Sequence, residues 1–135
     1  TLFRSMPIME QMKQDLMLSH SIKEKLIKGG VWTTKNIAES LKTNCPFVEE
    51  VKCNDKSNCI TATMNKEFLY LTNTLNTECY DSISESVKKV FYDNDDTVKN
   101  TLTDNEYKHC INNKKSMDIM YDISNTGKNV VIMHI

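Results

Sequence analysis

The chain contains five cysteines, and all of them lie between residues 45 and 110. Two of them, Cys53 and Cys59, bracket a short polar loop between two runs of strand-forming residues. Opposed residues of an antiparallel hairpin have Cβ atoms about 4.5–5.5 Å apart, and a disulfide needs about 3.5–4.5 Å, so a modest twist brings the sulfur atoms together. The spacing therefore predicts a disulfide, although two reduced and inert cysteines would leave the same pattern.

The loop between these cysteines is the candidate recognition loop, because a disulfide at its base would rigidify it. Its five residues are all polar or charged: Asn54, Asp55, Lys56, Ser57 and Asn58.

The remaining cysteines allow one further disulfide. Cys79 and Cys110 lie on the inward faces of adjacent predicted helices, and Cys45 would then be buried or linked to another chain. Structural zinc sites usually contain cysteines separated by about two to four residues, and no such pair occurs, so we expect no metal ion. Because disulfides persist in oxidising compartments, the cysteines indicate a secreted or surface-displayed protein; an intracellular location is the alternative.

Length and charge describe one ordinary domain. Its 135 residues are enough to bury a core without disulfides. The formal net charge of −1 predicts no general affinity for nucleic acid or membranes.

Thr1 is not methionine, so we expect a mature form or a fragment of a longer precursor. Lysine and asparagine are abundant and alanine is scarce, as in proteins of parasites or large DNA viruses with AT-rich genomes.

The first third of the chain is predicted to be helical. Pro7 suits a first helical turn, and apolar residues follow at helical spacing. Ser19 to Ser21 interrupts this pattern, and Ser21 with Glu24 forms a capping box that restarts a second helix, which Gly29 and Gly30 terminate. Another helix begins at Thr33 or Thr34 and ends at Asn44, before Pro46.

The middle of the chain predicts strands in two competing registers. One pairs Val48–Cys53 with Cys59–Met64, and the other pairs Ile60–Met64 with Glu67–Thr72. A three-stranded meander would satisfy both registers.

The last part returns to helices and then to a hairpin. Leu75, Cys79, Ile83, Val87 and Val90 recur at helical spacing. Thr103 and Glu106 form a capping box, and Asn125-Thr126-Gly127 offers the turn of a final hairpin ending in Val130, Val131 and Ile132. We therefore expect an α+β fold with four or five short helices packed on an antiparallel sheet made of two hairpin regions.

Catalytic and cofactor motifs are missing from the sequence. With only three glycines there is no phosphate-binding loop or dinucleotide fingerprint, so we expect no cofactor. His20, His109 and His134 have no local sequence that marks them as activated. We therefore expect that the protein is not an enzyme. The remaining catalytic hypothesis is a Cys/His pair assembled from residues distant in the sequence.

The first helix carries a candidate partner face, because methionine adapts to varied apolar surfaces. Core packing is the simpler explanation for the same residues. The face comprises Met6, Met9, Met12 and Met17, together with Trp32 after the glycine pair.

These observations favour a non-catalytic, disulfide-supported module that binds a protein partner. The alternative is an intracellular winged-helix-like regulator that binds nucleic acid, because Ile37, Ala38 and Leu41 have the spacing found in helix-turn-helix units. Glu49 and Glu50 oppose that alternative, since a recognition helix there would repel phosphate.

Overall fold

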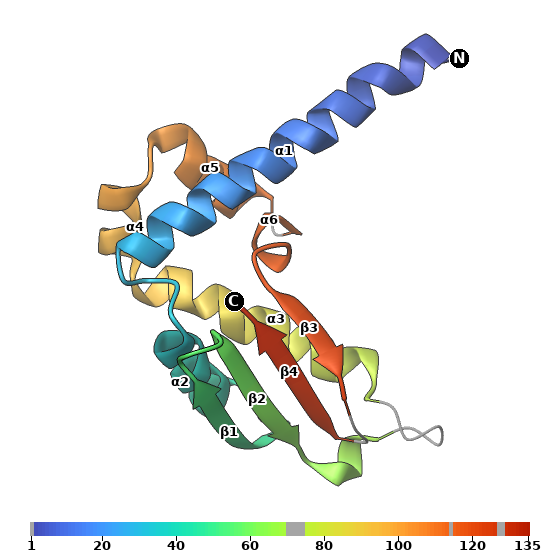
Figure 1. The fold of residues 1–135 in the computed structure, drawn as a ribbon, viewed down its shortest axis with the longest axis vertical. Helices are drawn as coiled ribbons and strands as arrows, with labels where there is room; N and C mark the ends of the chain where they lie inside the picture. The colour runs from blue at the N-terminus through green and yellow to red at the C-terminus, as the bar shows by residue number, and fades with distance from the viewer. Residues whose placement is uncertain (1, 70–74, 114, 127–128) are drawn as a thin grey trace.

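The computed structural model describes residues 2–69, 75–113, 115–126 and 129–135; within them, the side chains of residues 2–12, 68, 115 and 116 are not described. It shows an α+β fold in which a four-stranded antiparallel sheet, made of two hairpins, has helices packed on one face (Figure 1). The predicted fold class is therefore confirmed.

The helices are α1 (Leu2–Lys28), α2 (Thr34–Asn44), α3 (Thr77–Asp93), α4 (Asp95–Thr101), α5 (Asp104–Asn112) and α6 (Lys115–Asp118), with a 3-10 turn η1 (Lys66–Phe68). The strands are β1 (Val48–Asn54), β2 (Cys59–Met64), β3 (Asp122–Asn125) and β4 (Val130–His134), and they lie in the order β1-β2-β4-β3.

Strand β4 pairs with β3 on one side and with β2 on the other, and its pairing with β2 joins the two hairpins into one sheet. The backbone N–H of Met64 donates to the carbonyl of Asn129 at 2.7 Å, and the Asn129 side chain donates back to the Met64 carbonyl at 2.7 Å. The predicted meander is therefore wrong: β4 occupies the edge of β2 that Glu67–Thr72 was expected to pair with. Residues 66–68 form η1 instead, and residues 70–74 lie outside the described part of the chain.

Alternation along the strands gives the sheet a buried inner face and an open outer face. The inner face meets α2 and α3, which lie behind the strands in Figure 1, and its buried residues are Val51, Ile60, Ala62, Met64, Val131 and Met133. The outer face carries half-exposed residues such as Thr61 and Ile132, which are register partners. In strand β1 a register shift between Val48 and Glu50 marks a β-bulge.

Helix α1 is one continuous helix of 27 residues, so the predicted break near Ser21 is wrong. Ser19 is buried and its hydroxyl lies 3.3 Å from Nε2 of His109, so the stripe that faces the core runs through the predicted break. Glu24 lies 3.3 Å from His20 rather than capping a new helix. Tertiary packing has overridden the local capping signal, and α1 is not one of the short helices expected.

The predicted end of α1 is confirmed. Gly30 adopts φ +76°, the left-handed conformation that glycine tolerates best. The N–H of Val31 then donates to the Leu26 carbonyl at 3.0 Å, which closes the helix in a Schellman arrangement. Thr33 caps α2 as predicted, accepting from the N–H of Asn36 at 3.1 Å.

Trp32 follows this turn and lies in the core. It is 1% exposed, with its ring centroid 5.3 Å from that of Phe91 and 6.4 Å from that of Tyr121. Its assignment to a partner face is therefore corrected, because the Gly turn directs the indole between α3 and the approach to β3.

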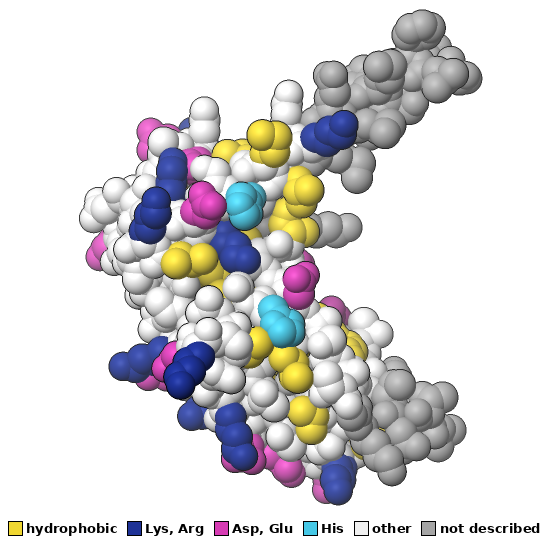
Figure 2. Space-filling view, viewed as in Figure 1, with side chains coloured by type: hydrophobic (Ala, Val, Ile, Leu, Met, Phe, Trp, Pro, Cys, Tyr) yellow, Lys and Arg dark blue, Asp and Glu magenta, His cyan; other side chains and the backbone are white. Residues whose placement is uncertain are grey.

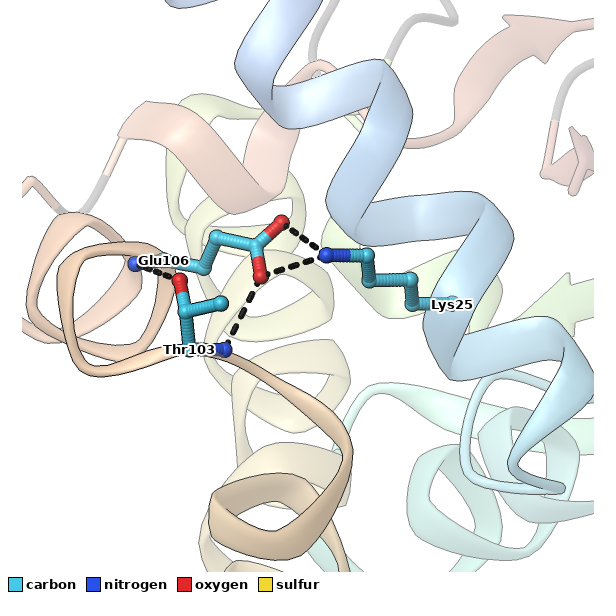
Figure 3. A network of polar contacts seen from close by, with 3 residues as sticks. All are labelled: Lys25, Thr103 and Glu106. Carbon is cyan, nitrogen blue, oxygen red and sulfur yellow. Dashed lines mark hydrogen bonds and ion pairs between the residues drawn. The ribbon is translucent and has the colours of Figure 1, made fainter.

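One ion pair holds α1 against α5 (Figure 3). Lys25 Nζ donates to both carboxylate oxygens of Glu106, at 2.7 and 2.9 Å, and the Glu106 residue is 5% exposed. The same carboxylate accepts from the N–H of Thr103 at 2.9 Å, which completes the predicted capping box. Burial alone would raise the pKa of Glu106, but the hydrogen bonds from Lys25 and Thr103 outweigh it and lower that pKa below its ordinary value.

We expect Glu106→Ala to lower the free energy of unfolding by about 2–3 kcal/mol, because it removes a helix cap and the partner of Lys25. The Lys25 side chain is 42% exposed and can be solvated, which keeps the loss below that of a fully buried pair. Urea unfolding measures the difference in the free energy of unfolding. Glu106→Gln is the control, because it keeps the size and shape of the side chain and removes its charge.

The pair should also make stability depend on pH. A carboxylate with a lowered folded pKa contributes fully above its ordinary pKa of 4.5 and loses that contribution as the pH falls through the lower folded value. The wild type and Glu106→Gln should therefore converge in stability in acid. A constant gap between them at all pH values would contradict this role for the charge.

Candidate functional site

An apolar groove lies where α1 passes α6. Its volume is about 390 Å³, and it is lined by Leu16, Met17, Ser19, His20, Lys23, Ile119 and Met120. Figure 2 shows hydrophobic side chains gathered along this part of α1 and beside it. Single exposed apolar residues are ordinary, but several around one hollow indicate a binding surface.

Helical geometry places the α1 side of this groove. Leu16, His20 and Lys23 follow one another at spacings of four and three residues, so they form a stripe on one side of the helix. Ser19 and Ile22 turn to the core instead. The outward stripe therefore has its apolar part at Leu16 and its polar part at Lys23.

The α6 side is held in place from α3. The carboxylate of Asp118 accepts from the Ser84 hydroxyl at 2.5 Å and lies 3.5 Å from Lys88 Nζ. Met117 and Met120 are buried on either side of this anchor, and Ile119 between them is left 50% exposed. Ile119, directly after the short helix, thus presents a large apolar side chain to the groove.

The groove combines an apolar surface with a cationic edge. Leu16 is 59% exposed and Met17 is 73% exposed, which is high for side chains that gain free energy on leaving water. The charged side chain that lines the groove is the cation of Lys23, next to the imidazole of His20. The arrangement can bind apolar side chains beside a carboxylate.

Helix α1 continues past the groove, and its N-terminal part extends beyond the rest of the molecule (Figure 1). Met17, from the predicted partner face, lies at the groove. Met6, Met9 and Met12 lie in the extending part, and their side chains are outside the described residues.

The predicted recognition loop is an exposed turn between β1 and β2. It is held by hydrogen bonds: Asp55 accepts from the Thr34 hydroxyl at 2.9 Å, and the Asn58 carbonyl accepts from the N–H of Ile135 at 3.0 Å. Asp55 thus sits at the N-terminus of α2, where the helix dipole favours a carboxylate. The recognition role of Lys56, Ser57 and the rest of the loop stays a prediction.

The structure does not bring Cys53 and Cys59 together. The register pairs Cys53 with Ile60 and Asn54 with Cys59, one position away from the direct opposition expected. Neighbouring register positions point to opposite faces of a sheet. The Cys53 sulfur accordingly lies 3.7 Å from the Thr34 carbonyl on the inner side, and the Cys59 sulfur lies 3.0 Å from Nδ1 of His134 on the outer side.

All five cysteines have free thiols in this structure. Burial raises the pKa of Cys79 and raises that of Cys110 to about 11. The Ser82 hydroxyl, one turn after Cys79, donates to the Cys45 sulfur at 3.3 Å. Cys79 therefore neighbours Cys45, while the charge that acts on Cys110 is that of Glu106.

Sequence reasoning identified one groove residue, Met17, and missed its neighbours. Leu16 was counted only among the apolar residues at helical spacing, although its position beside Met17 and four residues before His20 was a usable signal. Ile119 had no signal, because its exposure depends on Asp118 anchoring α6 to α3.

Within residues 2–69, 75–113, 115–126 and 129–135, no cluster of three or more His, Cys, Asp or Glu side chains is arranged to bind a metal ion. No helix of this part of the chain has the length and apolar character needed to cross a bilayer. Comparison of the chain with protein-family models, curated proteins and solved structures found no match.

We expect the double variant Leu16→Asp, Met17→Asp to lower the free energy of unfolding by no more than about 1 kcal/mol, because both side chains are solvent-exposed and each substitution costs about 0.5 kcal/mol. Leu26→Ala, in the core side of the same helix, should cost about 2–5 kcal/mol and is the matched comparison. Urea unfolding measures both. A large loss in the free energy of unfolding of the double variant would mean that these residues stabilise the fold and are not a free binding surface.

Proposed function

We propose that the protein is a non-catalytic binding module whose groove between α1 and α6 takes an amphipathic helix of a partner protein. The observation that carries the proposal is the exposure of Leu16 and Met17 on one side of the groove and of Ile119 on the other. A soluble domain gains nothing in folding from large apolar side chains held in water, whereas a partner that covers them gains the free energy of burial.

A helix suits the shape of this surface better than an extended peptide. Residues 16–23 of α1 span about two turns, or about 11 Å, and offer one straight wall. Recognition of extended peptides commonly uses an open sheet edge, whereas a straight apolar groove receives the apolar stripe of a helix. Of the two edge strands, β1 lies away from the groove, at the side of the sheet opposite β3 (Figure 1).

Charge indicates the chemistry of the partner. Lys23 lies on the rim of the groove, and a carboxylate beside the partner's apolar stripe would pair with it. Rim charges of this kind contribute more to specificity and association rate than to affinity. The partner helix is therefore expected to carry Leu, Met or Phe on one side and Glu or Asp at its border.

The winged-helix alternative receives no support from the order of elements. Helix α2 is followed directly by strand β1, and residues 45–54 contain no helix that could enter a DNA groove. Glu49 and Glu50 lie on this strand and are exposed.

To test the groove, two fluorescent amphipathic helical peptides of about 15 residues should be titrated, identical except for Glu or Lys at the border of the apolar stripe. The Glu peptide should bind more tightly by up to about fivefold, because an exposed ion pair contributes at most about 1 kcal/mol. Lys23→Glu should reverse the preference, and Leu16→Asp with Met17→Asp should weaken both peptides about tenfold or more. Fluorescence anisotropy gives the dissociation constants.

Tyr92→Asp is the matched control, because Tyr92 is 50% exposed on α3 and does not line the groove. It should leave binding unchanged. Failure of both peptides to bind, or an unchanged preference in Lys23→Glu, would overturn the proposal. Concentration-dependent dimers that the Leu16 and Met17 substitutions abolish would show that a second copy of the chain is the occupant.

A secreted or surface-displayed setting is part of the proposal, and the cysteines test it. In protein from an oxidising compartment we expect a disulfide between Cys45 and Cys79, the buried neighbours, rather than the Cys53–Cys59 and Cys79–Cys110 pairs expected from the sequence. Alkylation before and after reduction, followed by peptide mass mapping, identifies the pair. Five free thiols would contradict the oxidising setting and leave the groove proposal standing.

A further inference from the structure

A row of four side chains crosses the outer face of the sheet near one end. Register pairing places Asn54 opposite Cys59, Cys59 opposite His134, and His134 opposite Asp122. These residues come from four different strands. The row thus places a thiol, an imidazole and a carboxylate next to one another on the open face.

Cys59 and His134 are in hydrogen-bond contact within this row. The Cys59 sulfur lies 3.0 Å from Nδ1 of His134, and it also lies 3.4 Å from the Ser57 carbonyl. When Nδ1 is unprotonated it can accept the thiol proton, and once protonated it donates to the sulfur. A thiol with a base in this position has the arrangement of an activated nucleophile.

We propose that Cys59 is a reactive thiol, assisted by His134, that exchanges with small-molecule disulfides such as glutathione disulfide to form a mixed disulfide. Cys59 is half-buried and the face around it is open, so a disulfide can approach its sulfur. Thiol–disulfide exchange needs only an accessible thiolate and a disulfide, and no pocket for a tetrahedral oxyanion. That requirement favours exchange over acyl transfer at this open site.

The step balances without any further reactant. His134 takes the thiol proton, and the Cys59 sulfur attacks one sulfur of the disulfide. A new S–S bond forms as the old one breaks, and the departing thiolate takes the proton from the imidazolium. The attacking thiol is oxidised and one half of the small disulfide is reduced to a thiol.

The other cysteines provide an internal comparison. Cys45, Cys79 and Cys110 are buried and therefore shielded from reagents. Cys53 is more exposed than Cys59, but burial of its sulfur and, second, the Asp55 carboxylate raise the pKa of Cys53. Accessibility alone therefore predicts that Cys53 reacts first, whereas the Cys59–His134 pair predicts that Cys59 does.

The experiment incubates the reduced, folded protein with glutathione disulfide and locates the mixed disulfide over time by intact mass and peptide mapping. Cys59 should be modified before Cys53. His134→Gln keeps a polar side chain but removes the base, so it should slow the formation of the mixed disulfide at Cys59 by about tenfold or more. Cys53→Ser should leave the rate at Cys59 unchanged, and far-UV circular dichroism confirms that each variant is folded.

The dependence of the rate on pH separates base assistance from simple access. The register places the charged groups of Asp122 on β3 and Lys52 on β1 on this face beside the pair, and His134→Gln alters neither. Between about pH 8 and about pH 6 the wild-type rate should fall less steeply than that of His134→Gln. First modification at Cys53, or equal rates and parallel pH profiles for the wild type and His134→Gln, would overturn the proposal.

Discussion

The pairing of β2 with β4 is the interaction on which the rest of the structure depends. It joins two hairpins through residues 65 positions apart in the chain, Met64 and Asn129. This contact turns two hairpins, each marginal alone, into one four-stranded sheet with a face for α2 and α3 to cover. It also fixes which outer-face residues meet, because the β2–β4 register alone sets His134 beside Cys59.

A second constraint places α1. The helix contributes Ile22 and Leu26 to the core. Its Lys25 side chain pairs with the carboxylate of Glu106, which also caps α5. Because one side of α1 is committed to these contacts, its rotation about its own axis is fixed. Leu16 and Met17 are then held outward by the same geometry that buries Ile22, so the groove is a consequence of the fold.

Local signals in the sequence predicted much of this fold, and non-local contacts explain what they missed. Thr33, Gly30 and the Thr103–Glu106 box act within one turn of chain, and each was placed correctly. The hairpins were found, but the partner of β2 was not, since several apolar runs could fill the same edge. The break expected in α1 failed for the same reason: the burial of Ser19 against α5 is invisible in the sequence. Of the candidate site only Met17 could be read in advance, and the contact of Cys59 with His134 required the β2–β4 register.

The order of the strands has a consequence for backbone pairing between separate molecules. Its two lateral strands are β1 and β3, and both are poor templates for another chain. Strand β1 carries Glu49, Glu50 and Lys52 and is irregular near its start, while β3 has only four residues. Charges, irregularity and shortness all discourage edge-to-edge pairing with a strand of another molecule. Crowded molecules would therefore meet through side chains rather than through paired backbone.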